Sequence, residues 1–157
     1  MIEGDQLFGP DGRGTLVNFF DLGNTTTHWA MKEEAGRRMA LAALDRVYGQ
    51  PQTFTGPQLV RSTLKGGVIT CSFRHVGNGL KFEPSIDGIS GVVLVDKSGA
   101  RYWADVKVTA PDTLTLSHPK VADAISAHYG MHTNPHETLF NDAGFAAFAF
   151  SLSLIHI

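Results

Sequence analysis

The chain has 157 residues, of which 43% are apolar and 18% are charged, so it can bury a core and form one globular domain or slightly more. Its formal net charge of −2 and its pI near 6.4 give no electrostatic reason to expect binding to nucleic acid or to an anionic membrane. The single cysteine, Cys71, excludes an internal disulfide framework, and the sequence contains neither a membrane-spanning apolar run nor a signal-peptide pattern at its start.

The first half of the chain predicts a strand, a loop and a helix. Residues 1–14 are glycine-rich and aperiodic, which indicates a loop, whereas residues 15–20 (TLVNFF) are β-branched and aromatic, which favours a buried strand. A polar loop carrying His28 follows. Residues 30–48 then show helical spacing, because apolar side chains recur every three or four residues and should form its buried face: Met31, Ala35, Met39, Ala42, Ala43 and Val47.

Two acid-before-base pairs support this helix. Glu33 with Arg37, and Glu34 with Arg38, are each spaced four residues apart, as expected of ion pairs on an exposed helical face. Gly49 predicts the end of the helix.

The second half predicts short strands separated by turns, with no long helix after Tyr48. A hairpin is expected over residues 58–65 and 68–76 around Gly66-Gly67, with Ile69, Cys71 and Phe73 on one face. Another is expected over 91–95 and 101–108, followed by strands at 113–117 and 124–129. This pattern is typical of a β-sandwich-like module.

Three segments match motifs of one enzyme family. DLGNTTTHWAMKEEAGRRMALAALDRVYG, beginning at Asp21, resembles the end of the catalytic domain of sialate O-acetylesterases, which are carbohydrate esterases of the SGNH hydrolase superfamily. GPQLVRSTLKGGVITCSFRHVGNGL and the tail AHYGMHTNPHETLFNDAGFAAFAF are similar to later segments of the same family, so the resemblance covers about residues 15–150. Trp29 stands where the family usually has proline, and Thr25 stands where its acid would fall.

The resemblance implies an α+β protein with two parts. Residues 1–49 would be the last strand-loop-helix unit of an SGNH α/β catalytic domain, with a strand at 15–20 and a helix at 30–48, and residues 50–150 would be a β-rich, sandwich-like C-terminal module. It also implies that His28 is the catalytic base of a serine-type hydrolase acting on acetyl esters of sugars, with no metal and no organic cofactor. Members of this family are often secreted, periplasmic or lysosomal, which leaves the localisation of this chain open.

The nucleophile of such an enzyme is missing from this sequence. The family's serine lies in a G-Q-S-N type motif, which does not occur here, and Ser90 and Ser98 lie in strand and turn contexts. We therefore expect the chain to lack an N-terminal catalytic portion, which would be its partner along with an O-acetylated sugar, and to be inactive alone. Two alternatives stay open: His28 is a loop histidine that caps the helix, or the chain is a non-catalytic, glycan-binding or structural β-sandwich module.

Structural explanations are favoured for the tail, for three histidines and for Trp103. Residues 151–157 are expected to be an artefactual tail, because LSLIHI resembles the translation of a sequencing-library adapter. His128, His132 and His136 recur every four residues, but Gly130 and Pro135 interrupt a helix there, so a polar loop is favoured over a metal site. Trp103 is predicted to be a core residue, with stacking on a sugar as the alternative.

Overall fold

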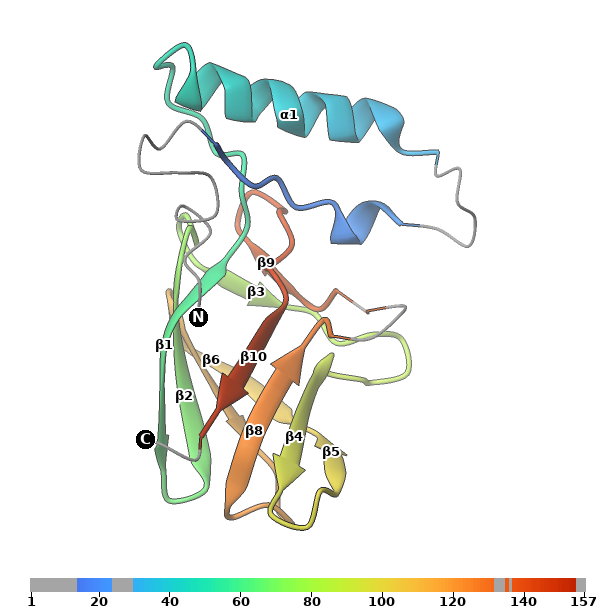
Figure 1. The fold of residues 1–157 in the computed structure, drawn as a ribbon, viewed down its shortest axis with the longest axis vertical. Helices are drawn as coiled ribbons and strands as arrows, with labels where there is room; N and C mark the ends of the chain where they lie inside the picture. Colours follow the sequence, from blue (N-terminus) through green and yellow to red (C-terminus); the bar gives the residue numbers. More distant parts are fainter. Residues whose placement is uncertain (1–13, 24–29, 132–134, 136, 155–157) are drawn as a thin grey trace. The chain divides into compact units, whose positions relative to one another are not determined.

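The computed structural model describes residues 14–23, 30–131, 135 and 137–154 (Figure 1). It divides into two compact units, Met1–Thr55 and Gly56–Ile157, which are described separately below. The described residues contain one α-helix and ten strands, so the protein is β-rich and of mixed α+β class, as the sequence predicted at this coarse level. The finer description, an SGNH remnant followed by a β-sandwich, stays a prediction.

The N-terminal unit contains a 3-10 turn, Phe20–Leu22, and the helix α1, Lys32–Arg46. The strand predicted over residues 15–20 is wrong, since residues 14–19 belong to no strand and the 3-10 turn follows them directly. Local hydrogen bonds replace a ladder: the amide of Phe20 donates to Asn18 Oδ1 (3.0 Å) and that of Leu22 donates to the Phe19 carbonyl (3.0 Å). A β-branched segment forms a strand only where a neighbouring strand is available to pair with it.

The helix α1 buries a different stripe from the one predicted. Ala35 and Ala42 are buried as expected, but Met39 is 53% exposed and Val47, just after the helix, is 73% exposed. The third buried residue is Arg38, which falls between the two alanines on one face because it lies three residues after one and four before the other. The apolar side chains of the helix therefore extend over a wider part of its surface than the part that is buried.

The C-terminal unit contains two four-stranded antiparallel sheets and one two-stranded sheet. The first sheet has the order β1-β2-β7-β6 and is formed by Gln58–Lys65, Val68–Arg74, Thr113–Ser117 and Asp105–Ala110. The second has the order β10-β8-β4-β5 and is formed by Phe150–Ser153, Ala124–Tyr129, Val92–Asp96 and Arg101–Trp103. The short pair is β3, Leu80–Phe82, and β9, Leu139–Asn141.

The predicted turns produce the predicted hairpins with one correction. β1 and β2 pair around Gly66 and Gly67, both at positive φ (59° and 79°), a conformation that costs glycine little. β4 pairs with β5 as expected. The segment 101–108, however, is not one strand: it breaks at the buried Ala104, so β5 joins the second sheet and β6 the first.

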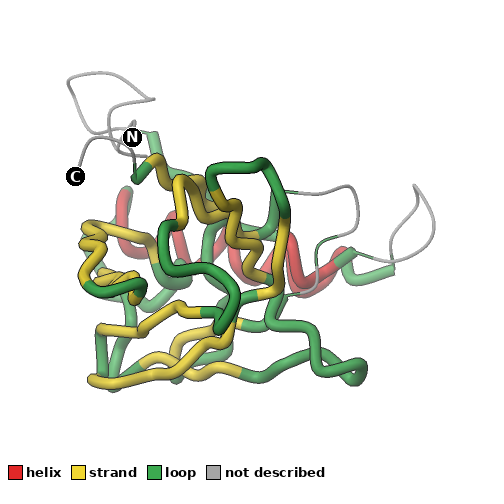
Figure 2. Tube along the Cα trace, turned by 90° about the horizontal axis from the view of Figure 1, so that it is seen from below, coloured by secondary structure: helices red, strands yellow, loops and turns green. Residues whose placement is uncertain are grey.

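Both four-stranded sheets contribute to one hydrophobic core. The predicted face of β2 is buried, with Ile69 and Cys71 at 0% exposure and Phe73 at 4%, and it shares this core with Leu94 of β4 and Ala127 of β8. Figure 2, which views the molecule from below, shows the strands on different levels rather than in one continuous sheet. Among the described residues, no helix has the length and apolarity needed to cross a membrane.

Part of the predicted tail belongs to this core. Ser151–Ser153 lie in β10, which pairs with β8, and Leu152 and Leu154 are each only 5% exposed. Residues 151–153 thus belong to the second sheet, and Leu154 adds to the core. The interpretation of 151–157 as artefactual in origin stays a prediction, and His156 lies outside the described residues.

Candidate functional site

The predicted catalytic residue, His28, lies outside the described residues, as do residues 24–29 that surround it. What the structure describes is the two flanks of this segment. On the N-terminal side, the 3-10 turn carries Asp21, and on the C-terminal side, α1 carries Glu34 and Arg38. The candidate site is therefore described through the residues on either side of this segment.

Arg38 connects the two flanks through charged hydrogen bonds. Its NH1 and NH2 groups donate to the two carboxylate oxygens of Asp21 at 2.7 and 2.5 Å, its NH1 also donates to the Asn18 carbonyl (2.9 Å), and its Nε donates to Glu34 (2.9 Å). The Arg38 side chain is 5% exposed, against 16% for Asp21 and 25% for Glu34. This fork geometry is the strong, bidentate form of an arginine-carboxylate pair.

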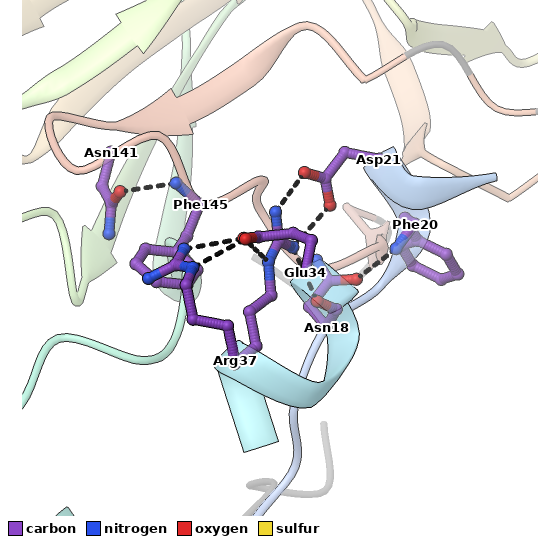
Figure 3. A network of polar contacts seen from close by, with 8 residues as sticks. Asn18, Phe20, Asp21, Glu34, Arg37, Asn141 and Phe145 are labelled. Atoms are coloured by element: carbon purple, nitrogen blue, oxygen red, sulfur yellow. Dashed lines mark hydrogen bonds and ion pairs between the residues drawn. The ribbon is translucent and has the colours of Figure 1, made fainter. Parts of the chain in front are cut away.

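Glu34 lies between two guanidinium groups, as Figure 3 shows. Arg37 donates through Nε (2.6 Å) and NH2 (2.7 Å), so its partner is Glu34, three residues before it, rather than the predicted Glu33. Hydrogen bonds from Arg37, then from Arg38, lower the pKa of Glu34 from 4.5 to about 2. Burial alone would lower the pKa of Arg38, but the hydrogen bonds that it donates to Asp21 and Glu34 outweigh this effect, and the pKa of Arg38 is raised.

This network holds the 3-10 turn and α1 together and is not a proton-transfer site. Its two carboxylates and two guanidinium groups balance in charge, and an arginine cannot act as an acid or base near neutral pH. Both oxygens of Asp21 accept hydrogen bonds from Arg38. This ion pair explains the position of the carboxylate without giving it a role in orienting His28. The ion-pair spacing predicts Arg38 on the exposed face, whereas its register with Ala35 and Ala42 is the signal in the sequence that indicates its burial.

The two serines considered as nucleophiles have structural partners, as predicted. Ser90 is buried, its Oγ lies 3.3 Å from the Val92 carbonyl oxygen, and its own carbonyl accepts from Thr138 Oγ1 at 2.6 Å. Ser98 lies in the turn after β4, where its Oγ donates to Asp96 at 2.6 Å. Neither position resembles an exposed nucleophile held beside a base.

Cys71 is a buried core residue, as predicted. Burial raises the pKa of its thiol from 9.0 to about 12, so the reactive thiolate is disfavoured.

His128 lies on β8 and is bonded by hydroxyls at both ring nitrogens. Ser126 Oγ is 2.9 Å from Nε2 and Ser151 Oγ is 2.9 Å from Nδ1. No ring nitrogen is left for a carboxylate of the kind that orients a catalytic histidine. His132 and His136 lie outside the described residues, and within the described part of the chain no group of three histidine, cysteine or carboxylate side chains could hold a metal.

The aromatic side chains on β5 differ from the prediction. Trp103 was expected in the core, yet it is 44% exposed, because it alternates with Tyr102, which faces inward and packs against His118 (ring centroids 4.8 Å apart). The alternation of a strand allows only one of two adjacent residues to point into the core.

Two segments that carry the family resemblance meet in space. The amide of Phe148 donates to the Pro57 carbonyl (3.0 Å), and a Cβ placed on the neighbouring Gly56 would lie 1.9 Å from the Ala146 carbonyl oxygen. Nearby, the Tyr129 hydroxyl accepts from the amides of Thr138 and Leu139, both at 3.2 Å. The glycine-proline motif and the C-terminal motif are therefore parts of one packed structure.

Asn141 closes a turn in the C-terminal motif. Its side-chain oxygen accepts from the amide of Phe145 at 2.9 Å (Figure 3). Its side-chain amide donates to the His75 carbonyl at 3.1 Å. Because Asn141 is completely buried, these bonds satisfy polar groups that would be costly to leave unpaired.

Comparison with known proteins gives matches among solved structures. No family model matches the sequence, and no curated protein matches it. Among solved structures, the crystal structure of a carbohydrate acetylesterase from Xanthomonas citri is similar, with a TM-score of 0.75 and 25% sequence identity. The match covers 85% of this chain and 31% of that chain, so this chain spans about a third of the enzyme's length. The similarity supports a carbohydrate-esterase-related fold.

Proposed function

We propose that this chain is the C-terminal part of a carbohydrate O-acetylesterase of the sialate type, within the SGNH hydrolase superfamily. The observation that carries the proposal is the similarity in both structure and sequence to a carbohydrate acetylesterase, over 85% of this chain. The match is too long to lie in the β-rich unit alone, so it includes part of the unit that contains α1.

The proposed reaction is a two-step acyl transfer. A serine of the missing N-terminal portion attacks the acetyl carbonyl while His28 takes its proton, and the resulting imidazolium protonates the sugar oxygen as the ester bond breaks. In the second step, His28 removes a proton from the water that attacks the acetyl-enzyme, then returns this proton to the serine oxygen as acetate is released. The sugar ester is the substrate, and no cofactor takes part in these steps.

In this proposal, Arg38 is a positioning residue for the segment that carries His28. Asp21 lies seven residues before His28, Glu34 lies six residues after it, and Arg38 binds both carboxylates. A bidentate bond to one flank and a hydrogen bond to the other restrain the distance between the two ends of this segment. Restraining a loop in this way reduces the entropy lost when a catalytic geometry forms.

A second function remains for the β-rich unit, as a non-catalytic module that recognises glycans beside another domain. The exposure of Trp103 favours it, since a core role for that side chain is ruled out. The upstream coding sequence separates the two proposals: a serine in a G-Q-S-N type motif, in frame, supports the esterase, and an unrelated neighbour supports the module.

A direct test uses the purified chain and p-nitrophenyl acetate. If the nucleophile lies outside this chain, the wild type and His28→Ala should hydrolyse the ester at the same slow rate as a His128→Ala control. Rapid hydrolysis that is lost only in His28→Ala would show that the nucleophile is already present, and the proposed division of the active site would be wrong.

A further inference from the structure

The outward face of the second sheet in the C-terminal unit carries an ordered row of side chains. In the register of the sheet, Ser151 of β10 lies opposite His128 of β8, His128 lies opposite Val93 of β4, and Val93 lies opposite Trp103 of β5 (strands in Figure 1). Their inward neighbours are buried, except for the half-buried Tyr102, whereas these four are exposed or half-buried. The row crosses three strand spacings, about 14 Å.

A second row lies beside the first on the same face. Ser153 lies opposite Ser126, Ser126 lies opposite Val95, and Val95 lies opposite Arg101. The outward face thus combines an aromatic ring at one edge, hydroxyl and imidazole groups at the other, and two valines between them. Arg101 is its one charged side chain among these eight positions.

The hydroxyl and imidazole groups form a chain with capacity left for a ligand. A neutral imidazole donates from one ring nitrogen and accepts at the other, so one of Ser126 and Ser151 accepts from His128 while the other donates to it. The accepting hydroxyl can donate its own proton outward, and the donating hydroxyl keeps a lone pair that can accept. Sugar hydroxyls, which both donate and accept, suit this pair.

Trp103 supplies the apolar part of such a site. Trp103 is 44% exposed on a face whose other members are small or polar, so part of its surface meets water, and the C–H face of a pyranose ring can cover that part. The single cation argues against a polyanionic ligand, and the restriction of large exposed apolar area to one ring argues against a protein partner.

We propose that this outward face binds the pyranose rings of an oligosaccharide, with Trp103 stacking on one ring and the Ser126-His128-Ser151 chain hydrogen-bonding another. The site lies on the β-rich unit, apart from the segment that carries His28 in the sequence. It would hold a glycan whether or not the chain is part of an esterase. The proposal therefore does not rest on the hydrolytic reaction.

The test is a titration of the complete, isotope-labelled chain, followed through amide and indole N–H signals by NMR. The probes are partly acetylated xylo-oligosaccharides, their deacetylated forms and sialyllactose. We expect saturable shifts of the Trp103 indole signal, assigned by its loss in Trp103→Phe, together with shifts of the His128 and Ser126 amides. Because the chain should be inactive alone, binding is measured without turnover.

Variants locate the site. Trp103→Ala should weaken binding about tenfold, the loss expected for one stacking contact of roughly 1.4 kcal/mol, while Trp103→Phe should retain part of it. Tyr48→Ala, which removes another exposed aromatic side chain from the N-terminal unit, is the matched control and should bind like wild type. His128→Ala should weaken binding and Ser151→Ala should do so to a smaller degree.

Two outcomes would overturn the proposal: absence of binding to every probe by the folded chain, or binding whose shifts cluster elsewhere and which Trp103→Ala leaves unchanged. Neither outcome would bear on the esterase proposal, which depends on His28. Conversely, a failed esterase test would leave glycan binding at Trp103 intact.

Discussion

Arg38 shows how one residue can serve both the fold and a proposed function. It is a permanently charged side chain, almost fully buried, and it satisfies two carboxylates and a backbone carbonyl at once. Breaking a buried ion pair from one side is costly because the remaining charge loses its partner. The neighbouring Arg37 makes a similar bond to Glu34 but is half exposed, which makes it a natural comparison.

Replacing Arg38 with methionine, which keeps an unbranched apolar stem and removes the charge, should destabilise the N-terminal unit by about 3 kcal/mol. Arg37→Met should cost only about 0.5 kcal/mol, as expected for an exposed pair. Native-state hydrogen exchange of the α1 amides measures this local stability separately from that of the β-rich unit. Equal loss of protection in the two variants would contradict the role assigned to Arg38.

The lowered pKa of Glu34 predicts an acid-sensitive helix. Because the folded-state pKa of about 2 lies below the ordinary value of 4.5, the ion pairs stabilise α1 fully above about pH 4.5, and this stabilisation is lost as the pH falls through about 2. Exchange protection of α1 should fall across that window. Glu34→Gln should remove that part of the pH dependence, and an unchanged profile in this variant would assign the acid sensitivity to other groups.

At the scale of elements, the sequence predicted what depends on local pattern and missed what depends on partners. Turn residues such as Gly66-Gly67 gave the β1-β2 hairpin, because positive φ is a local requirement. The strand predicted at 15–20 did not form, since strand character needs a neighbour. The exposed Met39 and the buried Arg38 have the same origin: helical period identifies a stripe, but tertiary contacts decide which part of it is covered.

A substitution at Gly56 tests the contact between the glycine-proline motif and the C-terminal motif. Its Cβ would meet the backbone of Phe145 and Ala146, which cannot rotate away as a side chain could. Gly56→Ala should therefore destabilise the β-rich unit by about 1–3 kcal/mol, the usual cost of overpacking. Gly36→Ala, in α1 with open space around it, is the control and should be neutral or stabilising in thermal unfolding. A tolerated Gly56→Ala would show that the segments are less tightly joined.

For the whole molecule, the β-rich character and the likeness to a carbohydrate esterase could be predicted from sequence, because both depend on motifs spread along the chain. The catalytic geometry could not, since this sequence has no G-Q-S-N type serine, and the role of His28 stays a prediction because this residue lies outside the described residues. The exposed Trp103 was also missed, because β-alternation leaves the choice of inward face to tertiary packing.

The central claim is that His28 is the base of a carbohydrate O-acetylesterase whose serine lies upstream. Its most direct test is to express the complete upstream-extended reading frame and measure acetate release from an O-acetylated sugar. Wild type should release acetate, and His28→Ala should be slower by at least about 10³-fold, as for other members of such catalytic units. Undiminished acetate release by a folded His28→Ala enzyme would contradict the claim.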